Sequence, residues 1–416
     1  MADPQQNKPV LLVGGHPIAH ALWEPLTQDY NLVFLYQQAS DMASSMGMKI
    51  PALVNFLTPQ ATEWALNEEA RLVAQMSGSM AEVSRRFGVA LEEDANLTGA
   101  SDELARFWPG YCVSHIHGLA QRVSALRAVS EQFEIAGCVT HEDVAPDTRS
   151  MVNWCNARAI PTVHVPHANC HLTNDGGPDI HRETRATWIA ASGVYAAQWY
   201  AQGGHPADRI RLTGMPQWDA LYDEHSIPGR QEARRVLGLP DDGLVLCYAM
   251  TWTQTTGLRG GWASELEAGW NAVIEATKAL GADLIVKLHP NDGATSEDAV
   301  AKAMNDSGVR GMVTRHHNSY VIRAADCLIA QGPSNMCTEA AILGTPSAYI
   351  QSEGFDYAYP LPYRCPPGSL TDTVREAISS RADPRWQEMC KVYNDAHPGG
   401  GSIRRVVEMV KEICQP

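Results

Sequence analysis

Short apolar runs alternate with longer segments of helical periodicity along most of this chain. The short runs, bounded by glycine or proline, are typical of strands buried on both faces, for example 10–13, 136–140, 244–249 and 327–330. Between them lie segments predicted as helices, including 194–202, 263–280, 336–343 and 370–379. This alternation predicts an α/β fold in which helices cover parallel sheets.

Two longer segments of the first half, 58–87 and 101–133, combine helical periodicity with strong helix formers. We expect both as helical layers over a sheet. A chain of 416 residues exceeds one comfortable hydrophobic core, so two domains are expected. The polar stretch 223–230, which contains Pro228 and Gly229, is typical of a linker between them.

The stretch 324–346 is predicted as a strand, a turn and a helix. Gly332 and Pro333 end the strand, and Ser334 is expected to cap the helix by accepting from the backbone N–H of Met336 or Cys337. Other amides of that turn, with the positive helix end, would form an anion site that includes Gly332, Ser334 and Asn335. An N-cap without any ligand is an equally good interpretation.

Other predicted strands also end in residues suited to a ligand. Gly15 follows the first strand, where glycine lets a ligand approach the backbone. Thr251 and Thr253 lie in a polar loop suited to phosphate or sugar contacts. Lys287 and His289 end another strand and would lie beside the anion site if the two strands are neighbours.

Histidines gather at one predicted strand exit. His164 and His167 end the run 160–167, and His171 and Asn174 follow in a polar loop. Since imidazole accepts protons at neutral pH, we expect a general base here, His167 first and His164 second. A metal site would need a further ligand, which the sequence does not single out.

A second polar cluster, His141-Glu142-Asp143, follows the predicted strand 136–140. It is interpreted either as a general base or as a cap of the helix predicted over 147–159.

Composition narrows the classes of partner and compartment. The 32 Lys and Arg against 47 Asp and Glu give a net charge of −15, which disfavours a broad nucleic-acid surface or an anionic membrane. The ten cysteines include no Cys-x-x-Cys pair, so we expect reduced, buried thiols. No signal peptide or spanning segment is predicted, and a cytoplasmic location is expected.

Several of these motifs together resemble the GT-B superfamily, which has two Rossmann-like domains facing across a cleft. They are the string Lys287-Leu288-His289-Pro290, the turn Gly332-Pro333-Ser334-Asn335, the helix with Thr338 and Glu339, and the layout of 185–223. The layout of 185–223 is similar to the segment that joins the domains in two GT-B relatives, the non-hydrolysing UDP-N-acetylglucosamine 2-epimerases and the CDP-glycerol glycerophosphotransferases. The resemblance covers roughly residues 135–350.

The resemblance implies a division into domains. Residues 1–225, with a final helical segment 384–416 that crosses back, would bind the acceptor. Residues 226–383 would bind the nucleotide donor.

The resemblance also implies roles for single residues. His167 matches a catalytic histidine of the glycerophosphotransferases, and His289 matches a second one. Ser334, Asn335 and Thr338 match the turn that holds the donor pyrophosphate. Glu339 would accept the ribose hydroxyls, although a plain helix face is an equal alternative.

The expected function is metal-independent, inverting transfer of a sugar or polyol phosphate from a nucleotide diphosphate to an acceptor hydroxyl. No cofactor is expected, and the partners would be a nucleotide-sugar donor and a glycan or other hydroxyl acceptor. The chain lacks Asp-x-Asp, which disfavours a metal-bridged donor.

Two alternatives stay open. An epimerase-like isomerase would need flanking carboxylates, for which Glu142, Asp143 and Glu183 are the candidates, although the epimerase His-Val-Glu-Ala-Gly stretch is replaced here by His164-Val165-Pro166-His167. A non-catalytic glycan-binding module is the other.

Overall fold

The computed structural model describes residues 8–14, 17–92, 101–167, 184–250, 262–289, 294–331, 334–351, 362–381, 383–395 and 399–415. The strands are β1 (Val10–Gly14), β2 (Asn31–Phe34), β3 (Ile135–Thr140), β4 (Thr162–His164), β5 (Trp188–Ala191), β6 (Ile210–Leu212), β7 (Val245–Ala249), β8 (Asp283–Lys287), β9 (Gly311–Thr314), β10 (Cys327–Gln331), β11 (Ser347–Ile350) and β12 (Arg364–Cys365).

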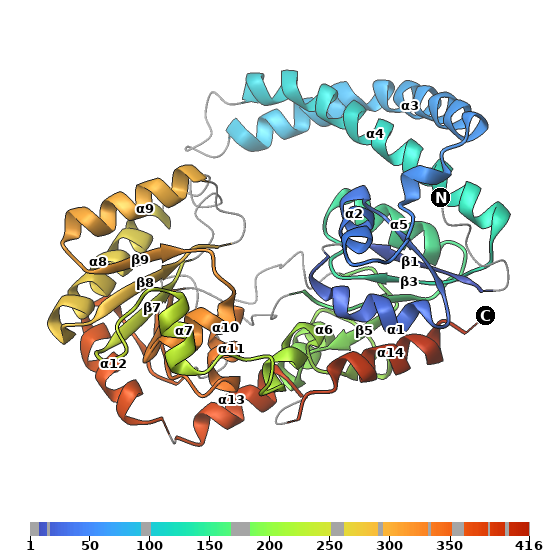
Figure 1. The fold of residues 1–416 in the computed structure, drawn as a ribbon. Coiled ribbons are helices and arrows are strands. Elements are labelled where there is room, and N and C mark those ends of the chain that lie inside the picture. The colour runs from blue at the N-terminus through green and yellow to red at the C-terminus, as the bar shows by residue number, and fades with distance from the viewer. Residues whose placement is uncertain are drawn as a thin grey trace. The chain divides into compact units, whose positions relative to one another are not determined.

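The α-helices are α1 (Trp23–Thr27), α2 (Gln37–Ser45), α3 (Pro59–Glu92), α4 (Ser101–Gln132), α5 (Pro146–Asn156), α6 (Val194–Gln202), α7 (Arg230–Val236), α8 (Trp262–Leu280), α9 (Ala294–Ser307), α10 (Asn318–Ala324), α11 (Asn335–Ile342), α12 (Leu370–Ser379), α13 (Arg385–Tyr393) and α14 (Ser402–Ile413). Short 3₁₀ helices include η2 (Leu53–Phe56) and η4 (Pro216–Tyr222). Strands and helices alternate as the apolar pattern predicts, and α6 and α12 coincide with their predicted ranges (Figure 1).

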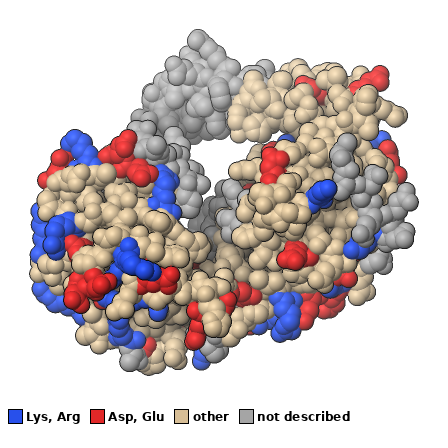
Figure 2. Space-filling view, viewed as in Figure 1, with Lys and Arg blue, Asp and Glu red and all other residues tan. Residues whose placement is uncertain are grey.

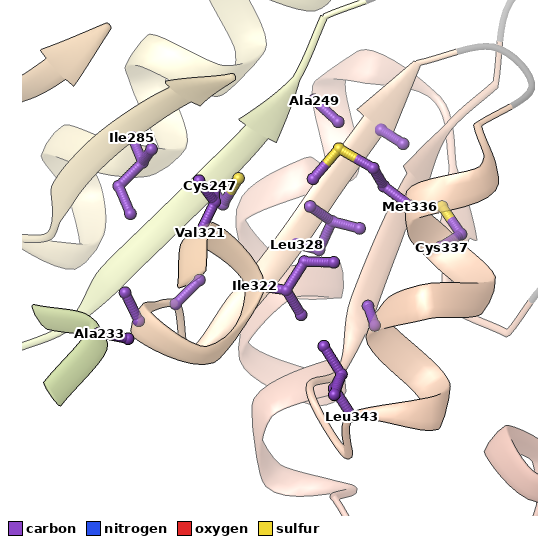
Figure 3. Close-up of a cluster of buried hydrophobic side chains, with 14 of the residues drawn as sticks. Ala233, Cys247, Ala249, Ile285, Val321, Ile322, Leu328, Met336, Cys337 and Leu343 are labelled. Carbon is purple, nitrogen blue, oxygen red and sulfur yellow. The ribbon is translucent and has the colours of Figure 1, made fainter. Parts of the chain in front are cut away.

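Two parallel sheets organise the chain. The first has the order β2-β1-β3-β4-β5-β6, and the second has the order β12-β11-β10-β7-β8-β9. Strands of the second sheet are apolar without alternation because helices cover both faces. In β7, Val245, Cys247 and Ala249 belong to a core that includes side chains of α7, α10 and α11 (Figure 3), whereas Tyr248 lies near Trp270 of α8.

The long helices α3 and α4 correct one prediction. They pair with each other as a hairpin that extends beyond the first sheet (Figure 1). Among the side chains of these two helices that the structure describes, Ala125, Leu126 and Val129 in the last part of α4 join the buried cluster that contains β1 and β3 side chains. The prediction that both helices cover a sheet was therefore wrong for most of this segment. Helical periodicity shows that a helix has an apolar stripe, but it does not show which element packs against that stripe.

Contacts divide the chain into two compact units. Unit 1 comprises Met1–His167, Glu183–Ile189 and Val407–Pro416, and unit 2 comprises Ala168–Arg182 and Ala190–Val406. The division passes through β5, so part of the first sheet is counted with unit 2.

The C-terminal helix α14 begins in unit 2 and ends in unit 1. At its start both oxygens of Asp219 accept backbone N–H groups, from Ser402 at 2.9 Å and from Ile403 at 2.8 Å. Just after its end the carbonyl of Cys414 accepts from the hydroxyl of Tyr30 at 3.1 Å. The glycines before α14 have no side chain that could cap it. The carboxylate of Asp219 therefore caps this helix from a distant part of the sequence.

Candidate active site residues

Two histidine side chains form hydrogen bonds with backbone carbonyls where β3 and β4 end. Nδ1 of His167 lies 2.9 Å from the carbonyl oxygen of His141, and Nδ1 of His141 lies 3.0 Å from the carbonyl oxygen of Val165. His141 is buried and His167 is half-buried. The strand exit therefore holds His167 in a defined orientation.

These contacts fix the protonation pattern of both rings. A carbonyl oxygen only accepts hydrogen bonds, so Nδ1 of His141 and Nδ1 of His167 each carry a proton. In a neutral ring the basic lone pair is then on Nε2. His167 thus has the tautomer that a general base acting through Nε2 requires.

The acidic neighbours serve structural roles. The carboxylate of Glu142 accepts from the backbone N–H of Ala145, the residue that precedes α5, so Glu142 is bound to the segment that leads into this helix. Asp143 is almost fully buried and accepts from the backbone N–H of Arg185 at 2.5 Å, while Arg149 donates to its carbonyl at 2.6 Å. His164 is buried within β4, in register with Thr140 and Ile189.

In unit 2, Ser334 caps α11 as predicted. Its hydroxyl accepts from the backbone N–H of Met336 at 3.2 Å, and its carbonyl accepts from the N–H of Cys337 at 3.2 Å. Both of those amides are thereby engaged within the turn. An anion site here would therefore use the remaining groups of the turn, Asn335 among them, and the positive helix end, and it stays a prediction.

Lys287 ends β8, but its strand is not a neighbour of β10. β7 lies between them, so the condition on which Lys287 was placed beside the anion site, that the two strands are neighbours, is not met. Parallel pairing order depends on tertiary packing, which local patterns do not report. Lys287 is 7% exposed, and its ammonium donates to the carbonyl of Leu288 at 3.1 Å.

Glu339 and Lys287 interact electrostatically in spite of the intervening strand. Burial lowers the pKa of Lys287, and the charge of Glu339 partly opposes that shift. Burial also raises the pKa of Glu339, which hydrogen bonds from Asn318 and Trp218 and the charges of His317 and Lys287 partly offset. The carboxyl edge of this sheet therefore carries a buried cation and a buried carboxylate of unit 2.

The carboxylate of Glu339 is held by two donors. Trp218 Nε1 donates to Oε1 at 3.2 Å, and Asn318 Nδ2 donates to Oε2 at 2.8 Å. Glu339 is 9% exposed, so the plain helix-face interpretation was wrong. A carboxylate accepts more than two hydrogen bonds, so contact with ribose hydroxyls stays a prediction.

The remaining predicted residues divide into two groups. His289 is half-buried just beyond Lys287, and Thr338 is buried within α11. Gly15, Thr251, Thr253 and Gly332 lie outside the described residues, as do His171, Asn174 and Glu183.

Three contributors were not predicted from the sequence. Trp218 lies in the stretch 185–223 but was given no role there, and Asn318 and His317 were not assigned at all. His317 accepts from the N–H of Ser319 at 3.3 Å as the N-cap of α10. The polar run His317-Asn318-Ser319 before apolar residues is a cap signal that could have revealed this helix.

Lys and Arg are interspersed with Asp and Glu over the visible face, without a broad basic area (Figure 2). Within the described ranges, no group of three or more His, Cys, Asp or Glu could hold a metal ion. No helix in the part of the chain that the structure describes is both long and apolar enough to cross a membrane.

Comparison with known sequences identifies a family over the centre of the chain. Residues 173–331 match the family of CDP-Glycerol:Poly(glycerophosphate) glycerophosphotransferase. The matched stretch includes Lys287 and His289, begins after His167 and ends before Ser334. This confirms the resemblance to that family over the matched residues. No curated protein matches the chain.

Solved structures share the fold at low sequence identity. UDP-GlcNAc 2-epimerase from Neisseria meningitidis, bound to UDP-GlcNAc, aligns with a TM-score of 0.56 and 14% identity, over 97% of this chain and 100% of its own. The S. aureus MnaA–UDP structure aligns at 0.55 and 14%, over 97% and 96%. A wall teichoic acid polymerase TagF structure soaked with CDPG aligns at 0.52 and 12%, over 99% and 91%.

These alignments and the two parallel sheets confirm the predicted α/β, GT-B class of fold. The family match over residues 173–331 supports the predicted class of enzyme, a nucleotide-dependent transferase.

Proposed function

We propose that this chain transfers a polyol phosphate or sugar from a nucleotide diphosphate donor to an acceptor hydroxyl, with His167 as general base. The observation that carries the proposal is the orientation of His167. Its Nδ1–H is bound to the carbonyl of His141, which leaves Nε2 as the basic atom. The family match over residues 173–331 supports a nucleotide diphosphate donor.

In the proposed reaction Nε2 of His167 takes the proton of the acceptor hydroxyl. The acceptor oxygen forms a bond to the transferred phosphorus or anomeric carbon. The bond from that atom to the nucleotide leaving group breaks, and its electron pair leaves with the nucleotide. Lys287, His289 and the α11 turn with Ser334, Asn335 and Thr338 would stabilise the charge that grows on the leaving group. Glu339 would contact the ribose, and no metal ion is required in this scheme.

We propose that acceptor and donor bind to different domains, as the resemblance implies. Residues 1–225 and 384–416 would bind the acceptor, and residues 226–383 would bind the donor. Gly15, Thr251, Thr253 and Gly332 belong to the proposed donor site. His164 is the second choice for the base, since it is the last residue of β4 and lies three positions before His167.

The leaving group distinguishes two versions of the reaction. Transfer of a polyol phosphate breaks the pyrophosphate linkage and releases a nucleoside monophosphate. Transfer of a sugar breaks the bond at the anomeric carbon and releases a nucleoside diphosphate, with inversion if displacement is direct. The family match favours the first version.

Product analysis tests the proposal. The protein is incubated with CDP-glycerol and with UDP-GlcNAc, each with and without a panel of hydroxyl acceptors, and the nucleotides are separated by chromatography. Acceptor-dependent release of CMP or UDP supports transfer. Conversion of the sugar without an acceptor would instead indicate an isomerase, and binding without any conversion would indicate a non-catalytic module.

A further inference from the structure

The side chain of His141 continues the contacts between β3 and β4 beyond the end of their backbone ladder. The ladder pairs Thr140 with His164, and the N–H of Val165 then donates to the carbonyl of Thr140 at 2.8 Å. Past this point the imidazole of His141 donates to the carbonyl of Val165 at 3.0 Å. In return the imidazole of His167 donates to the carbonyl of His141 at 2.9 Å.

The backbone of His141 is fixed from the opposite side. Its N–H donates to the carbonyl of Gly14 at the end of β1, at 3.1 Å. The carbonyl that receives His167 is therefore held by β1 through the same residue, and the ring is buried. The imidazole that binds the carbonyl of Val165 and the carbonyl that accepts from His167 thus belong to the same residue, His141.

We propose that His141 is a positioning residue for His167, a role that rests on the proposed function of His167 as the base. The imidazole of His141 fixes the carbonyl of Val165 and with it the turn 165–167. The turn presents the Nδ1–H of His167 to the carbonyl of His141, so that Nε2 is the atom that accepts the proton. When His167 becomes charged it still donates through Nδ1, and a charge-assisted bond is stronger than a neutral one.

This assignment gives a role to one member of the His141-Glu142-Asp143 cluster. Glu142 is engaged with the start of α5, and Asp143 with Arg185 and Arg149. His141 is the member whose side chain and carbonyl both take part in the turn that carries His167.

The test compares His141→Asn with His141→Ala. Asn Nδ2 is separated from Cα by the same number of bonds as His Nδ1, so the amide can donate to the carbonyl of Val165. Histidine ¹⁵N NMR of the labelled protein reports the tautomer of His167, whose resonances are identified by their loss in His167→Gln. The tautomer readout needs no substrate, so it is independent of whether the proposed reaction occurs.

We expect His167 to be protonated at Nδ1 in the wild type and in His141→Asn, and to show a mixture of tautomers in His141→Ala. With a productive donor and acceptor, His141→Ala should lower kcat about tenfold to a hundredfold, part of what a general base contributes, with little change in donor KM. His141→Asn should recover most of the loss.

Two outcomes would overturn the proposal. One is an Nε2–H tautomer of His167 in the wild type, which is measurable even if His141→Ala does not fold. The other is an unchanged His167 tautomer in a folded His141→Ala. If the tautomer behaves as expected but His167→Gln remains fully active, the positioning role holds and the assignment of His167 as the base fails.

Discussion

The indole N–H of Trp218 donates to the carboxylate of Glu339 at 3.2 Å, across 121 residues of sequence. Trp218 lies on η4 just before the polar stretch 223–230, and Glu339 lies on α11, the helix capped by Ser334. The bond therefore ties the proposed donor helix to a remote segment of the chain. It also satisfies a carboxylate that would be costly to bury alone.

Trp218→Phe should destabilise the protein by removing that bond. Loss of a donor to a buried carboxylate is expected to cost about 1–3 kcal/mol, measured as the free energy of unfolding in urea. The matched control is Trp23→Phe, because Trp23 is similarly buried and its Nε1 has no hydrogen-bond partner among the described residues. Equal costs for the two variants would contradict the role of the Trp218 bond.

The raised pKa of Glu339 predicts a pH dependence of stability. Because burial raises its pKa above 4.5, the folded state binds more protons than the unfolded state between the two values. The free energy of unfolding should therefore fall as pH rises from 4.5 through the folded pKa. Glu339→Gln removes this contribution, so the wild type should lose stability relative to the variant over that window. Urea titrations at several pH values measure the free energy of unfolding of the wild type minus that of Glu339→Gln. If this difference stays constant or rises with pH, burial does not raise the pKa of Glu339.

Lys287→Ala should weaken binding of a nucleotide diphosphate ligand. A ligand at about a hundred times its dissociation constant stabilises a protein by about 2.7 kcal/mol, which a thermal shift detects. We expect such a shift for the wild type and its loss in Lys287→Ala. Lys302→Ala is the control, since the Lys302 side chain is 76% exposed and its ammonium pairs with Asp306 on the same helix. Equal ligand-induced thermal shifts in Lys287→Ala and Lys302→Ala would contradict the assignment of Lys287 to the donor site.

Asp219→Ala should loosen the start of α14. Both carboxylate oxygens accept backbone N–H groups there, and loss of an N-cap costs about 1 kcal/mol, up to 2 in some proteins. Hydrogen exchange at Ser402 and Ile403 should accelerate. Asp306→Ala, at an exposed position in the last turn of α9, should change neither measurement appreciably. Unaltered exchange in Asp219→Ala would refute the cap.

Local chemistry explains which features could be predicted from the sequence. The cap by Ser334 follows from a serine after a glycine-proline break, and buried strands such as β7 follow from short apolar runs. Both depend on residues close in sequence.

Features that depend on distant residues were missed. The order that places β7 between β8 and β10, and the burial of Glu339 under Trp218, are set by tertiary packing. The orientation of His167 is a similar case. A histidine at a strand exit was predicted, but the carbonyl of His141 that fixes its tautomer could not be.

The most direct test of the account is the rate of acceptor-dependent nucleotide release by His167→Ala. The exposed His225 on the segment 223–230 provides the control variant His225→Ala. We predict that His167→Ala lowers kcat by a factor of about 10²–10⁴, the usual contribution of a general base, while donor binding persists and His225→Ala keeps the wild-type rate. A wild-type rate in His167→Ala would contradict the assignment of His167 as the base.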